Sequence, residues 1–318
     1  MERSKLLILA VFVLAGCVGT QPVNVDANRG LTIVDFSANP SEVQSGELVL
    51  FDVEIENIGG TAARNVQIDF FGIEEQWRDS GGNLIDSTLT QTFGNMQPPI
   101  LERGVPGDNR LAQIDIMTPA IPQGVSPTLS VEARASYDYN TSGFIDIPAV
   151  SEDEFRRKRI TGQQSPFPIT VLNSAGPIQM SMQQRFAPIR VDNTIDNEFQ
   201  VWPLRVELTN VGDGFPITEE DDVRIRGAGG RIFGTIEILG PGAEFEDCLG
   251  ETDGTFINLD STDLALRLRE TGSVPMACTI RIDKDIWNDR PEDSVKIIFN
   301  LFYRYYVSAS ANVRVIGR

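Results

Sequence analysis

The stretch Val49-Leu50-Phe51-Asp52-Val53-Glu54-Ile55-Glu56-Asn57-Ile58-Gly59-Gly60 predicts the fold class of this chain. Every second residue from Val49 to Ile55 is apolar, and the acidic residues Asp52 and Glu54 lie between them. This alternation is typical of a β-strand with one buried face. The asparagine and glycines of Asn57-Ile58-Gly59-Gly60 then indicate a turn. The stretch therefore predicts a strand that leads into a tight turn.

The same design occurs again in the second half of the chain. Apolar and polar residues alternate from Leu204 to Thr209, and the run ends at Asn210-Val211-Gly212-Asp213-Gly214. Another alternating strand follows each turn, at Val66–Ile68 in the first copy and at Val223–Ile225 in the second. A repeat at such a long separation indicates duplicated domains and not a solenoid.

The ends of the two halves also correspond. Apolar residues alternate from Val131 to Tyr139 and from Ile297 to Tyr305, and each run ends in two tyrosines two positions apart. A turn is expected after each run. A last strand is expected after each turn, at Phe144–Ile147 in the first half and at Asn312–Val315 in the second. Tyrosines two apart lie on one face of a sheet, so we expect them to pack in the core or on the sheet, in preference to stacking on a ligand.

These repeats predict an all-β fold with two immunoglobulin-like β-sandwich domains in tandem. The chain has 318 residues, which suits two enlarged sandwiches at residues 30–173 and 174–318. The boundary is expected at Asn173-Ser174-Ala175-Gly176-Pro177. One short helix is expected near the end of the first domain, from Ser151 to Arg159. Its serine has the capping-box spacing to a glutamate, and acidic residues precede basic ones, as the helix dipole favours.

The start of the first domain resembles a known family. The stretch Asn39-Pro40-Ser41-Glu42-Val43-Gln44-Ser45-Gly46-Glu47, followed by Phe51 to Gly59, resembles the opening of cell-adhesion-related Ig-like domains of the CARDB type in bacterial and archaeal surface proteins. The resemblance implies a sandwich of the immunoglobulin type. Such families supply stalks, spacers and binding modules, and the resemblance names no ligand. Pro177 to Phe199, before the second copy of the strand, lacks this signature.

The N-terminus predicts export. Arg3 and Lys5 precede an apolar run from Leu6 to Ala15, which is too short to span a membrane and has the flanks of a signal peptide. The four residues Leu14-Ala15-Gly16-Cys17 resemble the lipobox of exported lipoproteins, in which the cysteine is lipidated. The alternative is an ordinary signal peptide that contains a cysteine.

The lipobox resemblance implies an arrangement for the first 29 residues. Residues 1–17 are expected to be a signal peptide with its lipobox, Cys17 the lipidated residue, and residues 18–29 a tether. The protein would then lie on the extracytoplasmic side of a cell membrane, held there by the lipid on Cys17.

The net charge indicates which binding partners to exclude, and the cysteine content indicates a disulfide. The formal net charge of −18 argues against nucleic acid and against anionic headgroups as partners. With Cys17 assigned to lipid, Cys248 and Cys278 remain, and an exported chain favours a disulfide between them. A reactive or metal-binding pair and two buried free thiols are the alternatives.

The residue types argue against catalysis. The chain has no histidine, which excludes the hydrolase and zinc arrangements that need one. We expect no enzyme and no cofactor. For the acidic loops, a solvated surface is the favoured interpretation, and a structural calcium site is the alternative. Such loops offer oxygen ligands for calcium. The main candidates are Glu219, Glu220, Asp221 and Asp222, and a second loop contains Glu251, Asp253, Asp260 and Asp263.

Two functions are consistent with these features. The first is a non-enzymatic surface lipoprotein that acts as a spacer or as a binding and adhesion module for an envelope protein or glycan. The second is a carbohydrate-binding or carbohydrate-cleaving module that stacks sugars on Trp77, Trp202 or Trp287. Asn140-Thr141-Ser142 is in addition an acceptor pattern for glycosylation.

Overall fold

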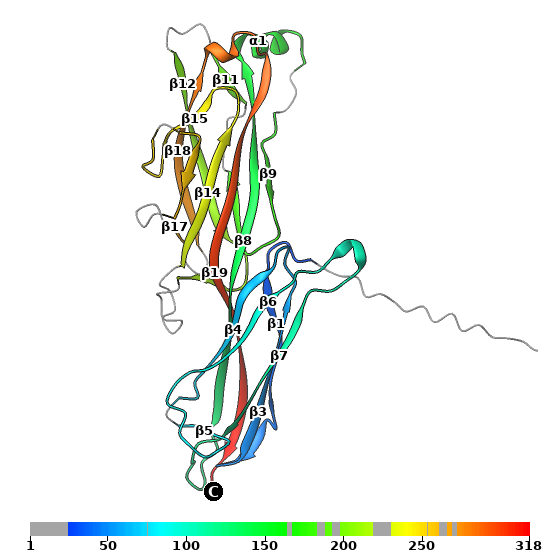
Figure 1. Cartoon of the computed structure of the whole chain (residues 1–318), viewed down its shortest axis with the longest axis vertical. Coiled ribbons are helices and arrows are strands. Elements are labelled where there is room, and N and C mark those ends of the chain that lie inside the picture. Colours follow the sequence, from blue (N-terminus) through cyan, green and yellow to red (C-terminus); the bar gives the residue numbers. More distant parts are fainter. Residues whose placement is uncertain are drawn as a thin grey trace, which may run out of the picture.

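The computed structural model of the chain is an all-β protein, as the sequence predicts (Figure 1). It describes residues 25–74, 76–163, 167–182, 188–192, 198–218, 230–252, 254–260, 266–268 and 272–318. Within these ranges the structure has β-strands, one α-helix and two short 3-10 helices, η1 (Leu101–Arg103) and η2 (Asp285–Trp287). The strands form sheets that stack as sandwiches.

One small sheet belongs to the first half of the chain. Its order is β1 (Leu31–Asn39), β3 (Leu48–Asn57), β7 (Asn109–Met117) and β5 (Arg78–Asp79), and all neighbours are antiparallel. The stretch that predicts the fold is β3. Its alternate residues, from Val49 to Ile55, are fully buried, while the residues between them are half-buried. The predicted burial pattern is therefore confirmed.

A second small sheet has the same order in the second half. It consists of β10 (Ile178–Met182), β12 (Phe199–Asn210), β18 (Ser273–Asp283) and β15 (Ala243–Cys248). The predicted strand from Leu204 to Thr209 is the second part of β12. It pairs with β10 and β18 and not with β3.

A single large sheet faces both small sheets. At its centre, β8 (Thr128–Ser151) and β19 (Glu292–Ile316) run antiparallel and side by side. The pairing continues from Thr128↔Arg314 to Val150↔Glu292 without a register shift. At 3.2–3.4 Å per residue, these strands are about 80 Å long. They therefore extend through both sandwiches, as Figure 1 shows.

Shorter strands flank the central pair in both halves. In the first half they are β4 (Ala63–Phe71), β6 (Leu89–Met96) and β2 (Glu42–Gln44). In the second half they are β14 (Gly230–Leu239), β16 (Phe256–Asn258), β11 (Ile189–Val191), β13 (Phe215–Ile217), β17 (Leu266–Leu268) and β9 (Thr170–Asn173). The two halves repeat an unusual detail. β2 runs parallel to the end of β19, and β11 runs parallel to the end of β8.

The strand order is that of an immunoglobulin-like sandwich. In that fold, strands A, B and E lie in one sheet and strands C, F and G in the other. In the first sandwich β1, β3 and β7 take the places of A, B and E, and β4, β8 and β19 those of C, F and G. In the second sandwich β10, β12 and β18 take the places of A, B and E, and β14, β19 and β8 those of C, F and G. Strand G of each sandwich is thus supplied by the other half.

The turns expected after Tyr139 and after Tyr305 are absent, and this corrects the sequence interpretation. Strand F of each sandwich continues straight into the other sandwich and becomes its strand G. Residues 306–311 contain no glycine, proline or asparagine, so the strongest turn-forming residues are absent there. Gly143 serves close packing instead, because a Cβ atom there would lie 2.0 Å from the carbonyl oxygen of Leu172 in β9.

This exchange crosses the boundary predicted at residues 173–177. Neither residues 30–173 nor residues 174–318 contain all the strands of one sandwich, because each range lacks its own strand G. The arrangement is a domain swap within one chain.

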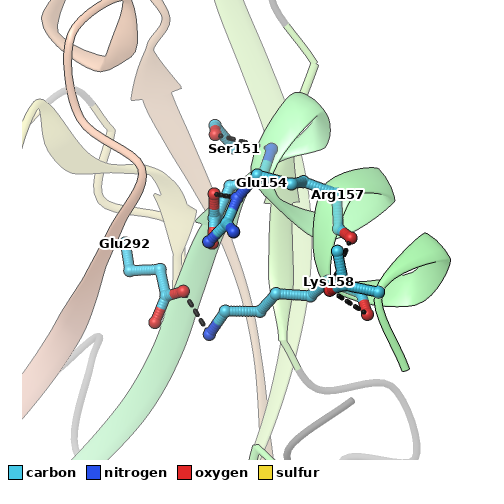
Figure 2. A network of polar contacts seen from close by, with 6 residues as sticks. Ser151, Glu154, Arg157, Lys158 and Glu292 are labelled. Carbon is cyan, nitrogen blue, oxygen red and sulfur yellow. Dashed lines mark hydrogen bonds and ion pairs between the residues drawn. The ribbon is translucent and has the colours of Figure 1, made fainter. Parts of the chain in front are cut away.

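The helix is α1 (Glu152–Ile160), and its predicted N-cap is confirmed. The backbone N–H of Glu154 donates to Ser151 Oγ over 3.3 Å. The reciprocal half of the capping box is not formed, because the Ser151 N–H donates to the carbonyl oxygen of Pro291 over 3.0 Å. The Glu154 carboxylate accepts from the Arg157 guanidinium (Figure 2). The assignment of the helix to the first domain is wrong. It lies at the far end of β8, and its Lys158 is paired with Glu292 of the second half.

Candidate functional site

The strand exchange relates the two halves by an approximate two-fold axis. In the central strand pair, Tyr137 faces Tyr305, Asp138 faces Arg304, and Tyr139 faces Tyr303. A rotation that swaps β8 and β19 therefore exchanges the two tyrosine pairs and leaves Asp138 and Arg304 at the centre. These two form an ion pair of 2.9 Å. We refer to this level, where the sandwiches meet, as the waist.

Tyrosine hydroxyl groups hold one turn in each half at the waist. Tyr305 donates to Asn210 Oδ1 and accepts from the N–H of Gly214, both over 2.9 Å. In the first half, Tyr139 accepts from the N–H of Thr61 over 3.1 Å and donates to the carbonyl oxygen of Ala175 over 3.2 Å. Both tyrosines are buried, so the packing role expected from the sequence is confirmed.

Burial also changes the acidity of these hydroxyl groups. Removal from water disfavours a phenolate. Burial accordingly raises the pKa of Tyr137, Tyr139, Tyr303 and Tyr305. All four remain neutral hydrogen-bonding or packing groups at physiological pH.

The N-terminal segment that the structure describes is attached at the waist. The N–H of Asp26 donates to the carbonyl oxygen of Ile58, and the N–H of Gly176 donates to that of Ala27, each over 3.0 Å. Arg29 is paired with Asp213 of the second half. The segment therefore bridges both turns.

A pocket of about 370 Å³ lies at the waist. Residues 138, 140, 302 and 304 contribute to it from the central strands, on the face opposite the buried tyrosine rings. The pocket lies beside β19 at the level where it pairs with the end of β13, at Ile217↔Arg304, and with the first part of β14, at Phe233↔Phe302. We call it the waist pocket. Its lining includes Arg64, Asp138, Asn140, Ile217, Arg231, Phe233, Phe302 and Arg304.

The described lining of the waist pocket contains more cationic than anionic groups. Among the lining residues that the structure describes, three are arginines and Asp138 is the one acidic residue. Arg304 donates to Asp138 Oδ1 over 2.9 Å and to Ser136 Oγ over 3.0 Å. The Nε atom of Arg231 is buried and has no hydrogen-bond partner. Arg64 is exposed and makes no ion pair with the residues that the structure describes.

The predicted site residues have different outcomes. Cys17 and the calcium candidates Glu219, Glu220, Asp221 and Asp222 lie outside the described residues. Within the described ranges, no three carboxylate or thiol groups come together as a metal site. Asn140 is half-buried and lines the waist pocket, and its glycosylation stays a prediction.

The structure joins Cys248 and Cys278 by a disulfide. They are directly paired residues of β15 and β18, with Cα atoms 4.2 Å apart, and both are buried. The bond therefore links two neighbouring strands at the edge of the second small sheet.

The three tryptophans do not form an exposed surface. Trp77 and Trp287 are buried, and Trp202 is partly buried and packs against the core. The described residues also include no helix with the length and hydropathy of a membrane span.

The arginines of the waist pocket are absent from the sequence predictions. Arg64, Arg231 and Arg304 lie far apart in the chain and form no motif. Only the register of β4, β14 and β19 brings them together, and that register depends on the strand exchange.

Comparison with known proteins leaves the family of this chain open. No family model matches it, and no curated protein is significantly similar. The solved structures that match include Pseudomonas fluorescens alkylpurine DNA glycosylase AlkC bound to DNA, at 10% identity and a TM-score of 0.23. That match covers 34% of this chain, which spans only 27% of the glycosylase chain.

Two other matches extend over most of both chains. The Enterococcus faecalis MSCRAMM ACE is 9% identical, covers 90% of this chain and 95% of its own, and has a TM-score of 0.18. The type II cohesin dyad from the adaptor ScaA scaffoldin of Acetivibrio cellulolyticus is 8% identical, with coverages of 84% and 83% and a TM-score of 0.13. Scores this low carry no argument, so the fold assignment rests on the strand order.

Proposed function

We propose that this chain is a non-enzymatic surface lipoprotein with CARDB-like domains. It acts as a rigid spacer or binding module for an envelope protein or glycan, on the extracytoplasmic side of a prokaryotic cell membrane. The observation that carries the proposal is the uninterrupted pairing of β8 with β19. Tandem domains joined by a linker move relative to each other by default. Here a bend at the waist would break backbone hydrogen bonds in the central ladder, so the two sandwiches form one rod.

The position of the N-terminal segment is consistent with an anchor at the middle of this rod. Eight residue steps separate Cys17 from Val25, the first residue that the structure describes. An extended chain covers at most about 3.6 Å per residue, so the waist would lie within about 30 Å of a lipid on Cys17. Both ends of the rod would then remain available to partners.

An apolar hairpin near the same place also supports a nearby membrane. Its tip carries Ile100, Leu101 and Val105, all exposed, around the helix η1. At its base the Asp108 carbonyl accepts from the N–H of Asn57. The neighbouring residue, Ile58, accepts from the N–H of Asp26. The tip thus projects from the level where the tether joins the rod. Exposed apolar side chains of this kind are stabilised at a lipid interface.

The positions of the tryptophans do not support the alternative function, a carbohydrate-binding or carbohydrate-cleaving module. It required tryptophan rings on the surface, and Trp77 and Trp287 are buried while Trp202 packs against the core. No observation favours sugar stacking on these residues.

The proposal is tested by a Cys17→Ser variant expressed in a heterologous prokaryotic host that lacks natural partners. We expect the wild-type protein to fractionate with membranes after a high-salt wash and the exported variant to be released. An Asn28→Ser variant, which changes the tether and leaves Cys17 intact, is the control and should stay with the membranes. An exported Cys17→Ser protein that resists the wash would contradict the anchor.

A further inference from the structure

We propose that the waist pocket binds a small organic oxyanion, meaning a carboxylate or phosphate group carried on a body the size of one sugar ring. The inference goes beyond the spacer role, and it does not depend on the lipid anchor. It rests on the lining of a pocket that the sequence features do not reveal.

The charge of the pocket favours an anion. Asp138 neutralises Arg304 through their ion pair, which leaves the guanidinium groups of Arg64 and Arg231 without a carboxylate among the pocket residues that the structure describes. Arginine stays charged at every accessible pH, and its planar fork of N–H donors matches carboxylate and phosphate oxygens. A cationic pocket also contrasts with the net charge of −18 for the whole chain.

Arg231 provides the most specific observation. Its Nε–H is buried and donates to no acceptor. A buried donor without an acceptor is unfavourable, and native proteins rarely retain one. The backbone N–H of Arg231 donates to Thr218 Oγ1, which fixes the backbone at this position. The side-chain Nε–H remains without an acceptor. An oxyanion in the pocket would supply the missing acceptor.

The remaining walls favour a ligand larger than a bare ion. Phe233, Phe302 and Ile217 provide apolar surface, and Phe302 is 48% exposed although it lies on a central strand. Asn140 and Asp138 offer hydrogen-bonding groups for hydroxyls. The volume of about 370 Å³ falls in the lower part of the range of small-molecule sites. A sugar-sized body would cover the apolar walls, which inorganic phosphate alone would leave in water.

Isothermal titration calorimetry on the detergent-solubilised full chain tests the proposal. The anionic probes are glucuronate and glucose 6-phosphate, which separate a carboxylate from a phosphate preference, and the controls are glucose and inorganic phosphate. We expect at least one anionic probe to bind at millimolar concentration or below, and each control to bind at least tenfold more weakly. Binding should weaken as salt is added. The absence of binding by both anionic probes would overturn the proposal.

Variants then assign binding to the pocket. Arg231→Ala should weaken binding of the preferred probe at least tenfold, and Arg231→Lys should recover only part of it, because lysine keeps the charge and loses the fork. Arg110→Ala, on β7 of the first small sheet, is the matched control and should have no effect. If Arg231→Ala does not fold, Arg64→Ala at the exposed rim replaces it. Unchanged affinity in a folded pocket variant would show that the probe binds elsewhere and would overturn the proposal.

Discussion

The hydroxyl of Tyr305 makes two hydrogen bonds in a buried position, whereas that of Tyr137 makes none of good geometry. A Tyr305→Phe change leaves the N–H of Gly214 without its acceptor. We expect it to lower the free energy of unfolding by about 1–2 kcal/mol. Tyr137→Phe removes only an unpaired hydroxyl and should change the free energy of unfolding by less than about 0.5 kcal/mol, or raise it. Urea unfolding of both variants is the measurement, and equal losses would contradict this account.

The buried tyrosines also predict how stability depends on pH. The pKa of Tyr137, Tyr139, Tyr303 and Tyr305 is raised in the folded protein. Below the unfolded value of about 10 both states keep their protons, so their contribution to stability is complete. Above it the unfolded chain releases protons that the folded protein retains. The free energy of unfolding should then fall by up to about 1.4 kcal/mol per pH unit for each tyrosine.

Two measurements check this dependence. Urea unfolding at about pH 9 and about pH 11 should give a lower unfolding free energy at the higher pH. Tyrosinate absorbance should rise mainly together with the loss of the folded far-UV spectrum. A full rise for all five tyrosines of the chain while the spectrum stays native would refute the burial of these hydroxyls.

At the scale of residues, the sequence predicts burial better than it predicts contacts. The period of two in the tyrosine runs predicts correctly that their rings lie on one face and pack inside. It does not reveal that Tyr139 and Tyr305 bind the loops after Asn57 and Asn210, because those bonds join segments far apart in the chain. The group formed by Arg64, Arg231 and Arg304 is hidden for the same reason.

Among the elements, β15 and β18 are joined by the Cys248–Cys278 disulfide across a sequence separation of 30 residues. The loop-entropy model gives such a closed loop about 3–4 kcal/mol of stability. A Cys248→Ala, Cys278→Ala double variant should lose about that much free energy of unfolding. Comparison with the oxidised wild type by urea unfolding tests this. Free thiols at both positions in exported wild-type protein would contradict the bond itself.

The strands themselves were predictable, but their connections were not. Alternation marks the two halves of β8 and of β19 correctly, because each half buries one face. Whether two such runs are joined by a turn or by a straight strand depends on a few residues between them. In β8 the sequence Asn140-Thr141-Ser142-Gly143 has turn residues, yet it stays extended because β19 pairs with it on one side and β9 with part of it on the other. Tertiary pairing thus overrides the local preference.

For the whole molecule, the exchanged strands predict that the two halves depend on each other. A fragment of residues 25–173 lacks β19, and a fragment of residues 174–318 lacks β8, so each sandwich would have an open edge in place of strand G. We expect neither fragment alone to match the stability of the full chain, and a mixture to form a one-to-one complex. The first fragment has turn residues at 140–143 and is the better able to fold β8 back as its own strand G.

The waist ion pair should decide which fragments combine. In a one-to-one complex Asp138 faces Arg304, as in the intact chain, whereas a pair of identical fragments related by the same axis would place two aspartates or two arginines opposite each other. Like charges directly opposite on neighbouring strands are destabilising. Asp138→Arg in the first fragment should therefore weaken the mixed complex, and Arg304→Asp in the second should restore it when both changes are present. Analytical ultracentrifugation measures this for the four mixtures of a wild-type or Asp138→Arg first fragment with a wild-type or Arg304→Asp second fragment. Fragments that each unfold cooperatively alone and do not associate on mixing would mean that the exchange is dispensable and that the halves are independent domains.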